Sequence, residues 1–380
     1  MELISNSTSS LIGNGTALGQ NENSTCIFVD SSAERISKLF VLSFILLGSF
    51  FGNIFIIIIV YMNRDLRKTI NYFIVNMALS DLVFPLILLP VRMTELVTDS
   101  EHWRVSGILG SIFCKLSYFA SLVSLLVSTQ SLVWIAIDRF VAVVYPMKLG
   151  LISAKIRTIA IVSTWIFASL VNFPSLTSSK LVVRDNDTAC VETNMESFLF
   201  DDKDNEKYLW LQFSLFIITP VVVTTFLYTA IAISLKLQKK ALAGTPSNAQ
   251  RHALRKRRQA IIMAVAILVL FYLCVTPQIL TYFIPYWIPS CDIQRVLFFV
   301  TSFSLYLSSI VNPLICLSFV ESYRRGLRNI LCRCGRKRNS NVTPKCREIN
   351  LMKMKTPDGE SYRQSSKNTE NSNEAFETVL

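Results

Sequence analysis

The sequence has few charged residues and very few histidines for its length. Charged side chains make up 17% of the 380 residues, whereas hydrophobic residues make up 51%; an average soluble domain has roughly 25% charged residues. Only two histidines are present, His102 and His252. The topology derived below puts them on opposite sides of a membrane, so they cannot share a metal or nucleophile site. The composition argues against a soluble protein and against an enzyme.

Formal charge is missing from long stretches of the chain. Six intervals carry none, and a seventh, from Thr69 to Val91, is interrupted only by Asp81. Each can cross a hydrocarbon core of about 30 Å, which needs roughly 20 helical residues. The six run between Lys38 and Arg64, Lys115 and Asp138, Arg157 and Lys180, Lys207 and Lys236, Arg258 and Asp292, and Arg295 and Glu321. We therefore predict an all-α membrane protein with a bundle of seven spanning helices. A soluble helical protein would lack the amphipathic helices needed to cover so many apolar ones.

The segment between the fifth and sixth expected spans is basic and contains no acidic residue. Its basic residues are Lys236, Lys239, Lys240, Arg251, Arg255, Lys256, Arg257 and Arg258. Because basic loops stay in the cytoplasm, the amino terminus is expected outside and the carboxy terminus inside, in the plasma membrane. The start of the sequence also lacks the pattern of a signal peptide, so the first span would direct insertion. The net charge of +12 is thus assigned to membrane orientation and anionic lipid rather than to nucleic-acid binding.

Glycosylation sequons agree with this orientation. Four fall on the expected outer side, at Asn6, Asn14, Asn23 and Asn186. A fifth sequon, at Asn341, falls on the expected inner side and is expected to stay unglycosylated.

The nine cysteines sort by compartment on the same topology. Four are expected outside, in an oxidising space, where an even number favours disulfides. They are Cys26, Cys114, Cys190 and Cys291. From the residues alone, three pairings remain open.

One ionisable residue, Asp81, stands in the interior of an expected span, and such residues are usually functional. Ser124 and Ser128 share a face of the third span, and Ser308 and Asn312 share a face of the seventh. Together these oxygens suit a monovalent cation such as sodium, which would be an allosteric ion in a protein with no other cofactor. Hydrogen bonding that only joins the helices is the alternative, and the residues alone do not decide between them.

Every expected span carries a motif position of one receptor family. The matching residues are Gly52 and Asn53; Leu79, Ser80 and Asp81; Cys114 and Arg139; Trp165; Pro220 and Tyr228; Phe271, Cys274 and Pro277; and Asn312 and Pro313. In this ordered set the chain resembles the rhodopsin-like, or class A, G-protein-coupled receptors over about residues 36 to 335.

The resemblance implies a disulfide between Cys114 and Cys190, leaving Cys26 and Cys291 as a second pair. It also implies that Asp138 holds Arg139 while the receptor is inactive, and that activation moves the sixth helix and frees Arg139 to line a cavity for a G protein. The residues implied in this coupling are Asp138, Arg139, Phe140, Tyr228, Phe271, Pro277, Asn312, Pro313 and Cys316. A ligand outside would shift the balance by binding one arrangement better.

Three positions depart from the family pattern. Phe140 replaces the tyrosine of DRY, Val275 replaces a tryptophan, and Cys316 replaces the tyrosine of NPxxY. We expect Phe271 and its neighbours to carry the helix bend in place of the tryptophan. Loss of the hydroxyl at position 316 is expected to alter the balance between the inactive and active arrangements.

Two ligand classes are disfavoured by single residues. Ser121 stands where similar amine receptors have an aspartate, and Tyr306 stands where opsins have the lysine that binds retinal. A peptide is favoured, because the stretch KLVVRDNDTACVET predicts a β-hairpin in the second extracellular loop, with its turn at Asn186 and Asp187. That loop is also acidic, which suits a basic peptide.

The expected ligand-binding residues project inward near the outer ends of their helices. They are Arg92, Glu95, Ser121, Leu125, Tyr282, Phe298, Ser302 and Tyr306. The chain is most similar to neuropeptide receptors of the RFamide and neuropeptide Y type, and Glu95 would pair with an arginine of such a ligand. A receptor for a lipid or other small molecule is the alternative. A transporter or channel is more remote, because it would need more intramembrane charge than Asp81 provides.

The chain divides into four expected regions. Residues 1–36 form a glycosylated outer tail, 37–318 the bundle, 319–334 an amphipathic eighth helix on the inner leaflet, and 335–380 a disordered cytoplasmic tail. Cys332 and Cys334 are palmitoylation candidates. The tail offers hydroxyl groups to receptor kinases and, through them, to arrestin, and it ends in a sequence, with Thr378 and Leu380, that suits a PDZ protein.

Overall fold

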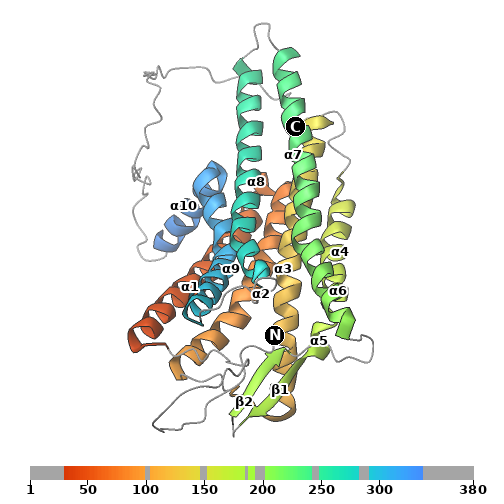
Figure 1. Cartoon of the computed structure of the whole chain (residues 1–380). Helices are drawn as coiled ribbons and strands as arrows, with labels where there is room; N and C mark the ends of the chain where they lie inside the picture. Colours follow the sequence, from red (N-terminus) through yellow and green to blue (C-terminus); the bar gives the residue numbers. More distant parts are fainter. Residues whose placement is uncertain are drawn as a thin grey trace. The chain divides into compact units, whose positions relative to one another are not determined.

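Long helices dominate the part of the chain that the computed structural model describes, residues 30–98, 103–145, 152–184, 187–192, 202–241, 248–281 and 291–336 (Figure 1). The long helices are α1 (Ser32–Met62), α2 (Thr69–Thr98), α3 (Gly107–Val144), α4 (Ala154–Asn172), α7 (Thr219–Ala241), α8 (Asn248–Leu280) and α9 (Cys291–Phe319). The shorter elements are η1 (Arg64–Leu66), α5 (Ser175–Ser178), β1 (Ser179–Arg184), β2 (Asp187–Glu192), α6 (Asp202–Phe213), η3 (Ser214–Ile218) and α10 (Glu321–Arg336). Seven helices in these ranges are long and apolar enough to span a membrane, which confirms the predicted fold class.

The first helix begins earlier than its apolar pattern alone predicts. Ser31 caps it by accepting a hydrogen bond from the Glu34 backbone N–H at 3.3 Å, and Glu34 Oε2 accepts one from the Ser31 N–H at 2.8 Å. This reciprocal pair satisfies backbone donors that the first turn leaves free. Helix α1 therefore starts at Ser32 and carries polar residues in its first turn.

The fifth span is not one uniform helix. It runs through α6, η3 and α7, and η3 is a π-helical turn directly before Pro220. Proline has no backbone N–H to donate, so the preceding turn loses a hydrogen bond and can widen. Further prolines lie inside helices at Pro85, Pro90, Pro277 and Pro313.

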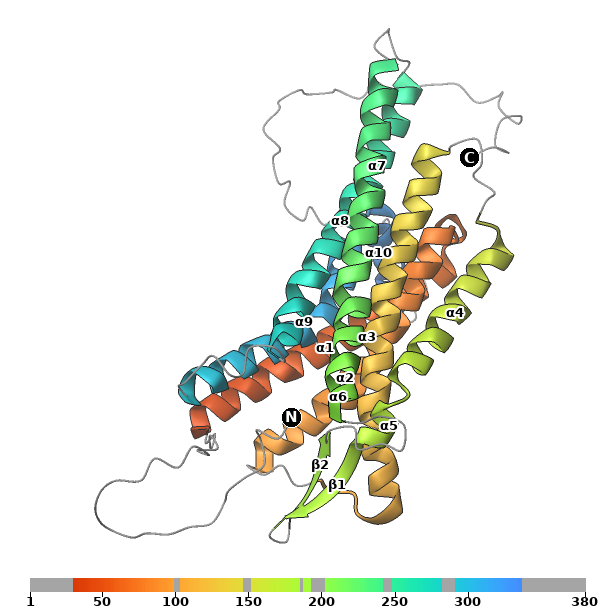
Figure 2. The ribbon, with the colours of Figure 1, turned by 45° about the vertical axis from the view of Figure 1, so that its right-hand side comes forward.

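Helix α3 packs against α2, α4, α7 and α8 (Figure 2). One end of the bundle carries the strands β1 and β2, and we call it the hairpin end. The opposite end carries the α1–α2 connection and the start of α10, and we call it the α10 end. Residues 1–331 form one unit and residues 332–380 a second, and the packing described here lies within the first.

Buried polar contacts join α2, α3 and α4. The side chain of Asn76 accepts a hydrogen bond from Trp165 Nε1 at 2.9 Å and donates one to Ser131 Oγ at 2.9 Å. Since no water is available in the hydrocarbon core, such contacts fix how these helices sit against each other. Helix α3 itself has 38 residues, which is long enough to reach both ends of the bundle.

The predicted hairpin is present in the loop after the fourth span. Strands β1 and β2 pair antiparallel, with Arg184 opposite Asp187. Asp187 is paired in β2, whereas positions 185 and 186 lie outside the described residues, so the predicted turn at Asn186 and Asp187 stays a prediction. A two-residue connection is the usual one for a tight hairpin.

Candidate functional site

The hairpin is fastened to α3 by a disulfide. Cys114 near the start of α3 is bonded to Cys190 in β2, with 5.7 Å between their Cα atoms, as predicted. A second attachment comes from Trp103, whose backbone N–H donates to the Thr188 carbonyl at 2.5 Å. The hairpin is thereby held over the space between α2 and α3.

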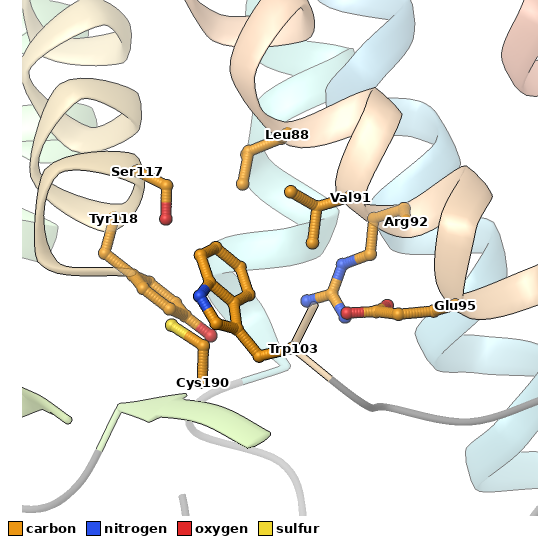
Figure 3. A pocket seen from close by; sticks show the side chains of 8 residues that line it. All are labelled: Leu88, Val91, Arg92, Glu95, Trp103, Ser117, Tyr118 and Cys190. Carbon is orange, nitrogen blue, oxygen red and sulfur yellow. The ribbon is translucent and has the colours of Figure 1, made fainter. Parts of the chain in front are cut away.

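A small pocket lies beneath the hairpin (Figure 3). Figure 3 shows the indole of Trp103 between Tyr118 and Arg92. The residues that line the pocket come from α2, α3, β2 and the segment before α3, and they are Leu88, Val91, Arg92, Glu95, Trp103, Ser117, Tyr118 and Cys190. Its walls combine apolar side chains with a few polar groups, and the enclosed space is about 20 Å³, room for about one water molecule.

The pocket contains an ion pair. Arg92 Nη1 lies 2.9 Å from Glu95 Oε2, and the two side chains are 39% and 25% exposed. A ligand arginine directed at Glu95 would therefore share this carboxylate with Arg92. The pair presents donor and acceptor groups side by side, so a ligand needs both kinds of group to satisfy it.

Of the seven predicted ligand residues that the structure describes, Arg92 and Glu95 line this pocket. Ser121 is buried, and its hydroxyl donates to the Ser117 carbonyl at 2.6 Å within α3. Leu125, deeper in α3, packs against the core of the bundle. Ligand contact with these two needs an opening deeper in the bundle.

The predicted ligand residues on α9 lie apart from this lining. Ser302 donates to Gln278 Oε1 at 3.0 Å, Tyr306 is buried against Phe84, and Phe298 is exposed. Tyr282 lies outside the described residues.

Sequence reasoning missed several residues near the predicted site. Leu88, Val91, Trp103, Ser117 and Tyr118 line the pocket, and Gln278 binds Ser302 from α8. Trp103 offered a signal, because it is an aromatic residue in a short polar segment. Tyr118 lies three residues before Ser121, so the helical period placed it on nearly the same face. Gln278 adjoins the motif residue Pro277 but had no pattern of its own.

A polar cluster surrounds Asp81 in the middle of the bundle. Its Oδ1 accepts a hydrogen bond from Ser128 Oγ at 2.7 Å, and its Oδ2 accepts one from Asn312 Nδ2 at 2.5 Å. Two other predicted residues bond backbone carbonyls. Ser124 of α3 donates to the Ser80 carbonyl of α2, next to Asp81, and Ser308 donates to the Leu305 carbonyl within its own helix. Their part in an ion site stays a prediction.

The donor set around Asp81 fits a small hard cation. Within the described residues, Asn53 Oδ1 and Asn312 Oδ1 are buried without a hydrogen-bond partner. Amide and carboxylate oxygens are what such a cation prefers. Asp81, Ser128, Asn312 and Asn53 would hold the ion, which would supply positive charge to a buried carboxylate.

At the α10 end, Asp138 and Arg139 form an ion pair. Arg139 Nη2 lies 2.5 Å from Asp138 Oδ2, and the two side chains are 20% and 10% exposed. Tyr228 of α7 lies close enough to Arg139 to interact electrostatically. The ring of Phe140 meets that of Tyr145 edge to face at 5.9 Å. The pairing is observed, whereas its role in activation stays a prediction.

Two further predicted switch residues, Phe271 and Cys316, lie in one buried core together with Val275. All three are fully buried there, and Cys316 is a free thiol. Asn312 bonds Asp81, and Pro277 and Pro313 lie inside α8 and α9. Phe271 meets the neighbouring Tyr272 ring edge to face at 5.7 Å. Val275 stands where the family has a tryptophan, one helical turn from Phe271, and the role of Phe271 in the helix bend stays a prediction.

Helix α10 follows α9 after the single residue Val320. Arg324, Arg325 and Arg328 are exposed on it. Arg325 donates to Glu321 at 2.7 Å, and this hydrogen bond and the arginine charges lower the pKa of the Glu321 carboxyl. The expected start at residue 319 is thus shifted to Glu321, since α9 continues to Phe319.

Several predicted modification sites are beyond structural description. Cys332 and Cys334 belong to α10 and Cys291 to α9, but their side chains are outside the described part. The other predictions outside the described residues concern Cys26, Asn6, Asn14, Asn23, Asn186, Thr378, Leu380 and the tail from position 337 onward.

Comparison with known proteins agrees with this architecture. Residues 52–315 match the family described as "7 transmembrane receptor (rhodopsin family)". The chain is 25% identical over 318 residues to a QRFP-like peptide receptor of Branchiostoma floridae, covering 79% of each protein. It is 26% identical over 289 residues to the neuromedin-K receptor of Rattus norvegicus, covering 75% of this chain and 61% of that receptor. It is 27% identical over 286 residues to neuropeptide Y receptor type 1 of Xenopus laevis, covering 73% of this chain and 75% of the receptor.

Proposed function

Since the chain belongs to the rhodopsin family of seven-transmembrane receptors, we propose that it binds an extracellular peptide and activates a heterotrimeric G protein. Members of this family are multi-pass membrane proteins that signal and do not catalyse. The proposal concerns the class of ligand, a peptide, and the intracellular partner, a G protein.

One observation carries the proposal: a single helix joins the two sites. Helix α3 bears Cys114, Ser117 and Tyr118 at the pocket, and Asp138 and Arg139 at the opposite end. The 25 positions from Cys114 to Arg139 span about 38 Å of helix, more than the hydrocarbon core. A change in how α3 packs at the hairpin end can therefore alter the environment of Arg139.

A peptide ligand is supported by the relatives and by the pocket. The named relatives are receptors for QRFP-like peptide, neuromedin K and neuropeptide Y. The pocket lies under a hairpin, and its Arg92–Glu95 pair offers both charges. A peptide supplies carbonyl acceptors and N–H donors that satisfy both. A basic ligand residue would approach Glu95, and the RFamide and neuropeptide Y types remain the favoured subclass.

The proposed orientation puts the hairpin end outside and the α10 end in the cytoplasm of a plasma-membrane receptor. It follows from the basic residues between the fifth and sixth spans and the disulfide at the hairpin end. Receptor kinases, arrestin and a PDZ protein are proposed partners of the carboxy-terminal tail.

The proposal is tested by nucleotide exchange on purified heterotrimers with the receptor in nanodiscs. Amidated peptides, lipids and amines are first screened for calcium or cAMP responses in cells, and the active compound is then used on the purified protein. We expect a peptide to accelerate exchange and Arg139→Ala to abolish the acceleration while peptide binding remains. Lys155→Ala, exposed on α4, is the control. An agonist that leaves exchange unchanged on every heterotrimer would contradict the proposal.

A further inference from the structure

A buried hydrogen bond joins α10 to the start of α2. Tyr323 is only 1% exposed, and its hydroxyl donates to Asn71 Oδ1 at 3.0 Å. Burial raises the pKa of Tyr323 well above its ordinary value, so the hydroxyl keeps its proton and remains a donor. Asn71 in turn donates to the Leu66 carbonyl at 2.7 Å. The contact therefore reaches from α10 through α2 to η1, in the α1–α2 connection.

The same region explains why a tyrosine fits at 323. Cys316 and Tyr323 belong to one buried core cluster, and they lie close enough to interact electrostatically. A cysteine is much smaller than the tyrosine that the family pattern has at position 316. The chain thus keeps a tyrosine hydroxyl at this end of the bundle, but it comes from α10 rather than from α9.

Helix α10 is also held against α1 by a close approach. A Cβ atom at Gly326 would lie 2.6 Å from Ile59 Cγ2 and 2.9 Å from Asn63 Nδ2. Glycine is therefore required for this packing. The two contacts, one through Tyr323 and one through Gly326, fix both the position and the rotation of α10.

The connection between α9 and α10 is short and hydrogen-bonded. Val320 N–H donates to the Cys316 carbonyl at 3.2 Å, and Tyr323 N–H donates to the Val320 carbonyl at 3.1 Å. Because only Val320 separates the helices, a shift of the end of α9 past Pro313 would carry Tyr323 with it. Such a shift would stretch or break the bond to Asn71.

We propose that Tyr323 is a positioning residue that holds the end of α9 against α2 and favours the arrangement in which Asp138 is paired with Arg139. The structure contains the two features together, the Tyr323–Asn71 bond and the closed Asp138–Arg139 pair. A bond present in one arrangement and lost in the other shifts the population toward the first. The nucleotide-exchange measurement of this role rests on the proposed signalling function, whereas the amide-exchange measurement does not.

The test compares the full chain in nanodiscs with Tyr323→Phe, which removes the hydroxyl and keeps the ring. We expect faster amide hydrogen exchange at the start of α10 and a rise of about fivefold in agonist-independent nucleotide exchange, the effect of losing one net hydrogen bond. Asn71→Ala should act in the same direction. Adding Tyr323→Phe to Asn71→Ala should then change little, because the two residues act through one bond.

Tyr72→Phe is the matched control, since Tyr72 is next to Asn71 and its ring lies under the Arg157 guanidinium at 3.8 Å. If Tyr323→Phe behaves like this control in both measurements, the proposal is overturned. Faster amide exchange with unchanged basal activity, in a receptor that still responds to agonist, also overturns it, because Tyr323 would then be a structural anchor only. If neither the wild type nor any variant activates a heterotrimer, the proposed function fails. The amide-exchange measurement still tests the bond in that case, because unaltered exchange in Tyr323→Phe would refute its role in holding α10.

Discussion

At the scale of single residues, Asp81 is the carboxylate best placed to bind a cation. Two side-chain donors reach its oxygens, and the neighbouring Asn53 and Asn312 have buried amide oxygens without a partner in the described part of the chain. A buried negative charge of this kind is costly unless it is compensated. A sodium ion would compensate it and bind preferentially to the arrangement that keeps these oxygens together.

We therefore expect sodium to stabilise the wild type and not Asp81→Asn. A ligand at about 100 times its Kd stabilises a folded protein by about 2.7 kcal/mol, which sets the scale of the effect. The measurement is the unfolding temperature in sodium chloride against choline chloride. Ser43→Ala is the control, because that hydroxyl donates to the Leu39 carbonyl within α1 and is not among the predicted ion ligands. A sodium effect that survives in Asp81→Asn would rule out this ion site.

Cys316 is a second residue whose identity matters, since it is fully buried where the family has a tyrosine. Cys316→Tyr adds a ring to a packed core, and overpacking of this kind costs about 1–3 kcal/mol. We expect a lower unfolding temperature and altered basal signalling. Leu314→Tyr, exposed on the same helix, should have little effect on either. Unchanged stability and signalling in Cys316→Tyr would show that the position is unimportant.

At the scale of elements, α10 depends on a glycine for its place against α1. Gly326→Ala improves helix propensity by about 1 kcal/mol, yet its Cβ would meet Ile59 and Asn63 at less than contact distance. We expect the clash to prevail and to speed amide hydrogen exchange in α10. Ser322→Ala, exposed on the same helix, is the control. Slower exchange in Gly326→Ala would mean that α1 yields and the packing is not tight.

The hairpin is a second element whose position depends on a specific attachment, the disulfide to α3. Cys190→Ser breaks the link to Cys114 across a sequence separation of 76 residues. Loss of such a disulfide costs about 2–4 kcal/mol of folding free energy. The hairpin should also exchange its amide hydrogens faster, because the disulfide no longer holds it and the Trp103–Thr188 hydrogen bond is a weaker attachment. Cys274→Ser, a free thiol in α8, is the control. Equal stability of the two variants would contradict the anchoring role.

At the scale of the whole molecule, orientation follows from charge and is open to a direct test. Removal of N-glycans from cell-expressed protein should lower its mass, and Asn6→Gln, Asn14→Gln, Asn23→Gln and Asn186→Gln should together abolish that shift. Asn341→Gln should change nothing, because its sequon is expected inside. A glycan at Asn341 would reverse the proposed topology.

The sequence by itself determined the number of spans and the class of fold, whereas the Cys114–Cys190 pairing was implied by the family resemblance. Runs without charge can only be accommodated in a bilayer as helices whose backbone groups are satisfied internally, so local composition is sufficient for this level. The position of Asp81, the Asp138–Arg139 neighbours and the motif prolines could be read in the same way, because each depends on chemistry within one span.

Only the tertiary structure decided which side chains meet. It placed Trp103 and Tyr118 beside Arg92, bonded the Ser124 hydroxyl to the Ser80 carbonyl, and joined Tyr323 to Asn71 across 252 positions of sequence. The rotation and depth of each helix fix these contacts, and packing between helices sets both. Composition determines that a segment enters the membrane, whereas the neighbours of each side chain depend on all the helices at once.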